Sequence, residues 1–129
     1  MQVKVIKRKA RIDQYLDEAV DAVNRGAYES AAQLYMKILE REPNHVMTHL
    51  NLGNVYAAVQ EYGKAEQAYL KTIEINPYYV FGSLSLAKLY LQTNRRDQAM
   101  AILKKINELL PHDPEVNLLM KRALQQLNR

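Results

Sequence analysis

Apolar and polar residues alternate along the chain with the period of an α-helix. Within each run, apolar side chains recur at every third or fourth position, and short polar segments containing Gly, Asn or Pro separate the runs. A run with this period buries one face and leaves the other in water. The pattern predicts an all-α fold. The predicted helices cover residues 12–25, 28–41, 46–60, 62–75, 80–93 and 96–109.

Three prolines punctuate this pattern at a constant interval. Pro43, Pro77 and Pro111 recur every 34 residues. Proline lacks a backbone donor and moves the residue before it out of the helical conformation, so each one ends a helix. The interval divides the chain into three segments that align without a gap, and each segment contains one helix pair. The segments are residues 12–45, 46–79 and 80–113.

Residue size also recurs at fixed sites of the three segments. One aligned site holds Ala31, Ala65 and Ala99, and another holds Tyr35, Tyr69 and Leu103. Small residues let two helices approach closely, while a large neighbour fills the remaining space. One helix pair cannot bury its apolar face alone, whereas stacked pairs can, and about three repeats are the usual minimum. The sequence therefore predicts a stack of three helix pairs.

A last helix is predicted after the third pair, over residues 114–129. Asp113 suits the cap position before a helix, and Pro114 suits the first helical position. This helix carries Lys121 where the earlier first helices carry a small residue. We interpret it as a capping helix whose outer face meets water.

These residues resemble the tetratricopeptide repeat. The second segment matches its signature best, with Leu52, Gly53, Tyr56, Ala65, Tyr69 and Pro77. The first supplies Tyr15, Ala19, Gly26, Tyr28, Ala31, Tyr35 and Pro43, and the third supplies Leu86, Ala87, Tyr90, Ala99 and Pro111. Two columns depart from the family pattern and bear on packing quality. They read Tyr15, His49, Ser83 and Ile38, Thr72, Ile106. The resemblance implies a right-handed α-solenoid, and we expect residues 1–129 to form a single domain.

The resemblance also implies a function. Similar proteins bind a peptide or a partner helix in a concave groove lined by the first helix of each pair. It follows that this chain is expected to be a non-catalytic protein-interaction module or adaptor. The groove residues that we single out are Met47, Asn51, Asn54, Phe81, Leu84, Lys88, Gln92 and Arg122.

The chemistry of this set is mixed. Met47 and Phe81 occupy matching sites and offer an adaptable and a rigid apolar surface, although such residues are also common in helix cores. Asn51 and Asn54 each present a donor and an acceptor, which suits a peptide backbone, although ordinary solvated polarity explains them equally well.

Charge along the predicted groove is uneven. Asp13, Asp17 and Asp21 follow one another at every fourth position and make one end acidic. Lys88 and Arg122 share an aligned site and would make the other end basic, unless they are plain surface charges. We therefore expect an apolar or mixed ligand, with any acidic residue near the C-terminal half of the groove.

One ligand class within the family is tested by the sequence itself. Some similar proteins hold the end of a chaperone tail with a two-carboxylate clamp of Lys, Asn, Asn, Lys and Arg. Two registers are possible, and they read Leu16, Val20, Asn51, Phe81, Ser85 and Leu50, Asn54, Ser85, Glu115, Leu119. Each register satisfies one position of five, so we expect no chaperone-tail binding.

Composition adds a basic N-terminal arm, residues 1–11, and limits other chemistry. The net charge of +4 is concentrated there, because the arm has five basic residues, no acid and a near-neutral remainder. The arm suits a solvated tail or the start of a helix better than a nucleic-acid surface. No cysteine is present, no apolar stretch is long enough to span a membrane, and no secretory leader is evident. We expect a cytoplasmic chain.

An enzyme is the first alternative, and little supports it. The sequence has no Gly-rich phosphate loop and no nucleophile elbow, and we expect no cofactor. His45 and His49 share a helical face and could in principle bind a metal, but no third ligand is evident. RNA recognition would need a repeated side-chain code that the groove residues lack. We therefore expect no catalytic site, no metal and no nucleic-acid partner.

Self-assembly is the second alternative. The arm alternates apolar and basic residues in "MQVKVIK" and could lie in the groove of another copy or add an extended edge segment. The acidic end of the groove would suit it electrostatically. A homo-oligomer that forms through the arm and the groove is therefore possible beside partner binding.

Overall fold

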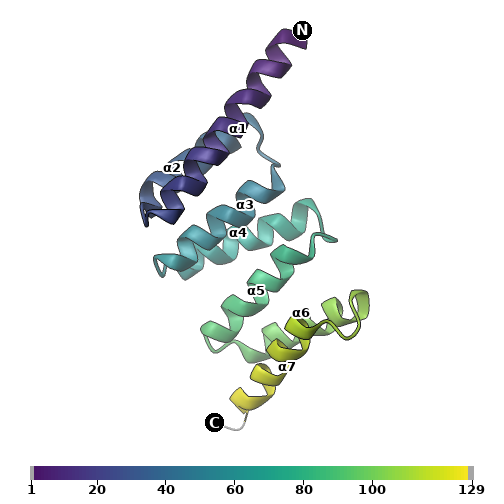
Figure 1. The fold of residues 1–129 in the computed structure, drawn as a ribbon. Coiled ribbons are helices and arrows are strands. Elements are labelled where there is room, and N and C mark those ends of the chain that lie inside the picture. The colour runs from purple at the N-terminus through teal and green to yellow at the C-terminus, as the bar shows by residue number, and fades with distance from the viewer. Residues whose placement is uncertain (1, 128–129) are drawn as a thin grey trace. The chain divides into compact units, whose positions relative to one another are not determined.

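The computed structural model describes residues 2–127, except for the side chains at positions 2, 5, 6, 8, 10 and 127. Over this range the chain forms helices and no strand, which confirms the predicted all-α fold (Figure 1). The helices are α1 (Gln2–Asn24), α2 (Tyr28–Arg41), α3 (Val46–Ala58), α4 (Tyr62–Ile75), α5 (Val80–Gln92), α6 (Arg96–Leu109) and α7 (Pro114–Leu127). The first residue of the predicted arm and the last two of the predicted capping helix lie outside the described range.

The second helix of each pair begins and ends where the sequence predicts. These helices are α2, α4 and α6, and their bounds are the predicted ones at both ends. The first helices α3 and α5 begin as predicted and end one or two residues early. Proline and turn residues set these limits because they interrupt the backbone ladder that apolar periodicity alone would extend.

The turn inside each pair has the same backbone conformation. Gly26, Gln60 and Asn94, which are 34 residues apart, all have positive φ, at 75°, 64° and 60°. The N–H of each donates to the carbonyl three residues earlier, and the next N–H donates to the carbonyl five residues before it, with N···O distances of 2.7–3.3 Å. This pair of bonds is the Schellman motif that closes a helix through a left-handed residue.

The joint between pairs also repeats. At Pro43, Pro77 and Pro111, the N–H two residues after the proline donates to the carbonyl of the residue before it, at 3.1–3.3 Å. Proline occupies the second position of this turn, where its fixed φ is favourable. The next helix starts at once, so each joint is a short reversal.

The chain packs as two compact units, Met1–Ala68 and Tyr69–Arg129, and the boundary falls within α4. In the first unit α1 packs on α2, and α2 packs on α3. In the second unit α6 lies between α5 and α7, and α5 also contacts α7. A single domain of residues 1–129 remains a prediction.

The recurring small residues lie in the interior, as predicted. Ala31, Ala65 and Ala99 have no exposed surface, and the large residues of the neighbouring column, Tyr35, Tyr69 and Leu103, are at most 3% exposed. Close helix approach at the alanines and filling by the large side chains therefore operate together in each pair.

One departure from the family pattern is compensated in space. Thr72 is fully buried on α4, at a site where the family has a small residue. A Cβ atom placed on Gly82 of α5 would lie 2.6 Å from Thr72 Cγ2, far inside van der Waals contact. The absence of a side chain at Gly82 is therefore what makes room for the threonine methyl group.

The described part of the N-terminal arm is helical. Residues 2–11 continue α1 without a break, which confirms the expected start of a helix and differs from the extended edge segment of the self-assembly alternative (Figure 1). No Gly or Pro separates the arm from Ile12, and its Lys, Arg and Gln residues favour the helix. The helix therefore propagates through the arm.

The last helix begins as predicted. Asp113 Oδ2 accepts a hydrogen bond from the Val116 N–H at 3.1 Å, which is the expected cap. Val116, Leu119 and Ala123 are buried, while Lys121 is exposed. Leucines at positions 118 and 124 are also about half exposed, so the outer face of α7 is mixed rather than purely polar.

Candidate functional site

The first unit has a small apolar hollow on its first helices. Asn51 and Asn54, two of the predicted groove residues, lie at its α3 wall. Its volume is about 290 Å³, and its lining is Val20, Val23, Tyr28, Tyr35, Asn51, Asn54, Val55 and Ala58. Apolar walls with two amides on one side provide burial for a side chain and hydrogen bonds for a backbone.

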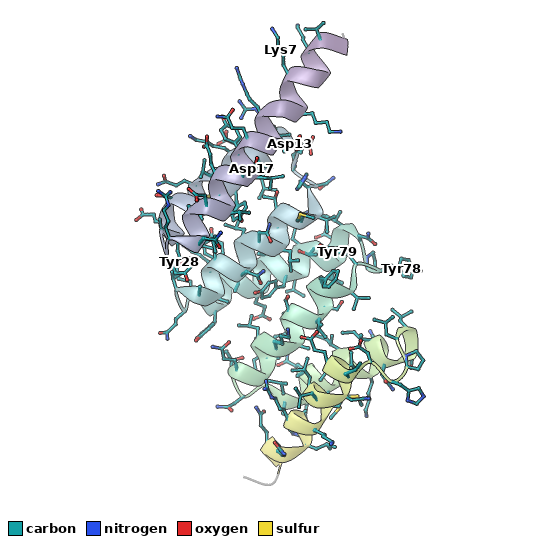
Figure 2. The ribbon with its side chains drawn as sticks, in the orientation of Figure 1. Lys7, Asp13, Asp17, Tyr28, Tyr78 and Tyr79 are labelled. Atoms are coloured by element: carbon teal, nitrogen blue, oxygen red, sulfur yellow. The ribbon has the colours of Figure 1, made fainter. Side chains whose placement is uncertain are left out.

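Two tyrosines in this hollow come from α2 and were assigned by sequence to packing alone. Tyr35 is almost fully buried, and that burial raises the pKa of its hydroxyl above the ordinary value of 10.0. It therefore stays neutral and contributes mainly its ring. Tyr28 is only half-buried and projects from the first turn of α2 (Figure 2). A tyrosine of the repeat signature is expected to pack in the interior, so the sequence did not indicate that Tyr28 reaches the surface.

Met47 lies on the same helix as the two asparagines but outside the hollow. It occupies the first turn of α3, and 52% of its side chain is exposed. An exposed thioether on the first helix is consistent with a contact residue.

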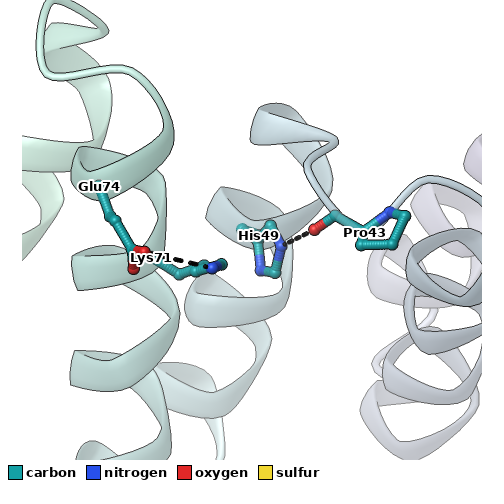
Figure 3. Close-up of polar contacts among 4 residues, drawn as sticks. All are labelled: Pro43, His49, Lys71 and Glu74. Atoms are coloured by element: carbon teal, nitrogen blue, oxygen red, sulfur yellow. Dashed lines mark hydrogen bonds and ion pairs between the residues drawn. The ribbon is translucent and has the colours of Figure 1, made fainter.

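Two histidines, one just before α3 and one in it, stabilise the N-terminal end of this helix. His45 is the cap residue, and its Nδ1 atom accepts the Thr48 N–H at 3.3 Å. His49 Nε2 donates to the Pro43 carbonyl at 2.7 Å (Figure 3). Each imidazole therefore stabilises the joint between α2 and α3. Among residues 2–127, no three His, Asp or Glu side chains gather in a way that could hold a metal.

The second unit has a different hollow, between α5 and α7. Its volume is about 390 Å³, and it is lined by Lys88, Leu91, Gln92, Leu119, Arg122 and Gln126. Three predicted groove residues, Lys88, Gln92 and Arg122, are thus brought together. Leu91 and Leu119 are at most 7% exposed and form an apolar floor. Gln126, which the family resemblance also places on the groove side of the last helix, lines this hollow; its Nε2 donates to the Leu91 carbonyl at 2.9 Å and ties α7 to α5.

The cations of this hollow are not equivalent. Lys88 Nζ forms an ion pair with the Glu115 carboxylate on α7, and both side chains are about half exposed. Arg122 has no ion-pair partner within the described residues. The positive charge available to a ligand is therefore carried mainly by Arg122, and Lys88 is partly neutralised.

Phe81 stands at the start of α5 and is 61% exposed. Its ring packs edge-on against Tyr79, with centroids 5.5 Å apart. The neighbouring Tyr78 is 80% exposed, and Figure 2 shows the two tyrosines at this corner. An exposed aromatic ring held by another ring is a suitable apolar anchor, because little side-chain freedom is lost on binding.

One predicted groove residue offers little surface. Leu84 is only 7% exposed and lies in the interior of the second unit. The groove pattern was carried over by helix position alone, which places Leu84 one turn after the exposed Phe81 but does not show that neighbouring side chains cover it. We do not retain it as a contact residue.

The acidic stripe is present on α1. Asp13, Asp17 and Asp21 are exposed, and Figure 2 labels the first two on this helix. Asp21 forms an ion pair with Arg25 at 3.6 Å. In the described part of the chain, no helix is long and apolar enough to cross a membrane.

Two family models match the sequence, and both describe the tetratricopeptide repeat. One matches residues 46–79, the range predicted for the second repeat, and the other matches residues 67–123. Together they cover more than half of the chain. No curated protein sequence matches it.

Solved structures share the fold at low sequence identity. The first tetratricopeptide domain of Spaghetti (RPAP3) bound to an HSP90 peptide has a TM-score of 0.84 at 16% identity, covering 93% of this chain and 95% of that chain. The TPR2B domain of yeast Sti1, in complex with an Hsp70 peptide, has a TM-score of 0.81 at 17% identity, with 91% and 98% covered. The tetratricopeptide domain of Arabidopsis OM64 has a TM-score of 0.83 at 15% identity, with 92% and 98% covered.

These likenesses confirm the predicted α-solenoid fold, and the repeat signature agrees with both family models. The chain therefore belongs to the tetratricopeptide repeat family.

Proposed function

We propose that this chain is a non-catalytic interaction module that binds a peptide or a partner helix on the first helices of its repeats. The observation that carries the proposal is the position of two hollows, one in each unit. Each is lined mainly by first helices and the capping helix, and five of the eight predicted groove residues line them. Met47 and Phe81 add exposed apolar surface on the same helices.

The ligand that these surfaces suit is mixed in character. The hollow of the first unit combines apolar walls with Asn51 and Asn54, which supports a buried side chain beside a hydrogen-bonded backbone. The hollow of the second unit adds Arg122 and an apolar floor, which supports an acidic residue. A peptide with apolar residues and an acidic one meets both requirements.

Two of the similar structures contain chaperone peptides, bound to those proteins. This chain has Leu50, Ser85 and Leu119 at positions where a two-carboxylate clamp needs Lys, Asn and Arg. We therefore propose a different peptide class for it.

Capture of a partner from native lysate tests the proposal. We would compare the wild type with a Phe81→Ala, Arg122→Glu variant, because Arg122 is unpaired among the described residues and its change should not disturb packing. The matched control is Leu118→Ala, Lys121→Glu, which likewise removes one exposed apolar side chain and reverses one positive charge, but on the outer face of α7. We expect the first variant to lose the partner and the control to retain it. Equal capture by all three proteins would overturn the proposal.

Self-association is a second candidate, favoured by a basic hollow on the first unit. Lys4, Lys7 and Arg11 of α1 line it together with Glu40 and Arg41 at the end of α2 (Figure 2 labels Lys7). The exposed acidic stripe lies further along the same helix, so two copies could pair through opposite charges.

Light scattering tests this candidate. We expect the wild type to associate at low salt and a Lys4→Glu, Lys7→Glu, Arg11→Glu variant to be monomeric. A wild type that stays monomeric at every concentration would end this candidate. A cytoplasmic location and the absence of nucleic-acid binding stay predictions.

A further inference from the structure

Helix α5 presents two different contact groups on one side. Phe81 and Lys88 are seven residues apart, which places them two turns, or about 10 Å, apart along the helix axis. Both are exposed, one as a large ring and the other at the edge of the α5–α7 hollow. A peptide in the polyproline II conformation rises about 3.1 Å per residue and completes a turn every three residues. Its side chains three positions apart therefore lie on one face and match this separation.

A carboxylate of the chain itself already contacts Lys88. Glu115 reaches from the first turn of α7 to the ammonium group of Lys88 on α5. It comes from the aligned site that Phe81 occupies on α5. The chain therefore shows that this place accommodates a carboxylate, and it supplies one of its own.

We propose, on the basis of the binding role above, that the α5–α7 surface selects peptides with a large apolar residue and an acidic residue three positions apart. Glu115 acts there as an internal competitor for the acidic residue. The ligand carboxylate contacts Arg122 and displaces Glu115 from Lys88, while Leu91 and Leu119 lie beneath the peptide.

How strongly Glu115 competes for Lys88 depends on how exposed their ion pair is to water. Lys88 and Glu115 are each about half exposed, so water screens their attraction and displacement is inexpensive. Removing the charge of Glu115 should therefore strengthen the binding of an acidic peptide about two- to fivefold. It should leave a neutral peptide unaffected, because the apolar contact with Phe81 does not involve Glu115.

The test uses two capped probes, acetyl-Leu-Ser-Ser-Glu-amide and acetyl-Leu-Ser-Ser-Gln-amide. Their affinities would be measured from chemical-shift changes of the full ¹⁵N-labelled chain. The proteins are the wild type, Glu115→Gln, Arg122→Gln and the control Glu29→Gln. The control also removes one carboxylate from the first turn of a helix, α2, but it leaves Lys88 paired. Amidated ends keep the side-chain carboxylate as the only acidic group.

We expect the wild type to prefer the Glu probe, Glu115→Gln to increase that preference, Arg122→Gln to remove it, and Glu29→Gln to match the wild type. An unchanged preference in Glu115→Gln would overturn the internal-competitor inference. If both probes still shift α5 resonances in that case, the proposed binding role survives. If neither probe shifts any resonance of α5 or α7 in any protein, the inference and the binding role of this surface both fail.

Discussion

At the scale of single residues, the turns inside the helix pairs show what the sequence can and cannot predict. Turn residues predicted the breaks after α1, α3 and α5, but not the shared left-handed conformation of Gly26, Gln60 and Asn94. Glycine adopts this conformation freely, asparagine tolerates it and glutamine has no special aptitude for it. Tertiary packing of the repeat imposes it on Gln60.

Replacing Gln60 by glycine should therefore stabilise the protein. A side chain destabilises the left-handed conformation, and glycine removes this cost. The benefit exceeds the cost of the extra conformational freedom that glycine gives the unfolded chain, so we expect the free energy of unfolding to rise by about 0.5–1 kcal/mol. Urea unfolding measures it. Asn94→Gly is the matched control and should gain less. A loss of stability in Gln60→Gly would contradict this assignment of the turn.

Burial of Tyr69 predicts a sensitivity to high pH. Burial raises the pKa of its hydroxyl from 10.0 to about 12, so the folded protein keeps a proton that the unfolded chain releases. The resulting stability is complete below pH 10 and is lost as the pH rises towards 12, by roughly 2–3 kcal/mol. Denaturation at pH 7 and pH 11 should show a smaller drop for Tyr69→Phe than for the wild type. An identical drop in the free energy of unfolding of both proteins would contradict the raised pKa of Tyr69.

At the scale of helices, the sequence predicts elements best where local chemistry ends them. The bounds of α2, α4 and α6 follow from prolines and turn residues, and they were predicted at both ends. The start of α1 was not, because no residue before Ile12 stops a helix and the alternating arm also fits an extended segment. The backbone hydrogen bonds that continue from α1 into the arm decide between the helical and the extended conformation.

The cap of α7 provides a test at this scale. Asp113 accepts the Val116 N–H, so Asp113→Ala should cost about 1 kcal/mol. Asp113→Asn is the control, since asparagine caps a helix as well as aspartate does. Thermal unfolding would compare the three proteins. Equal losses in both variants would indicate that charge, rather than the hydrogen bond, is what matters at this position.

At the scale of the whole molecule, the family pattern identified the surface but not its electrostatics. It placed Asn51, Asn54 and Arg122 at hollows, yet it treated Lys88 as a guide for the ligand. The Glu115 carboxylate that pairs with Lys88 comes from another helix. Periodicity within one helix contains no information about such a partner, and it likewise did not distinguish buried Leu84 from exposed Phe81.

From the side chains along the whole binding surface, we expect a chaperone peptide to bind this chain weakly. The HSP90 peptide SRMEEVD, which is bound to Spaghetti in a similar structure, should bind this chain at least tenfold more weakly than it binds that protein. Four of the five clamp positions lack the required side chain in either register, and each lost charged hydrogen bond costs about 1.5–3 kcal/mol. Calorimetry with both proteins measures the difference. Comparable affinities would show that the ligand class is wrongly assigned.

Hydrogen–deuterium exchange of the chain, alone and with its captured partner, would show which helices the partner covers. We expect the bound partner to slow exchange in α1, α3, α5 and α7, and to leave the exchange of α4 and α6 unchanged. Protection confined to α4 and α6 would contradict this expectation, because the partner would then bind the second helices of the repeats.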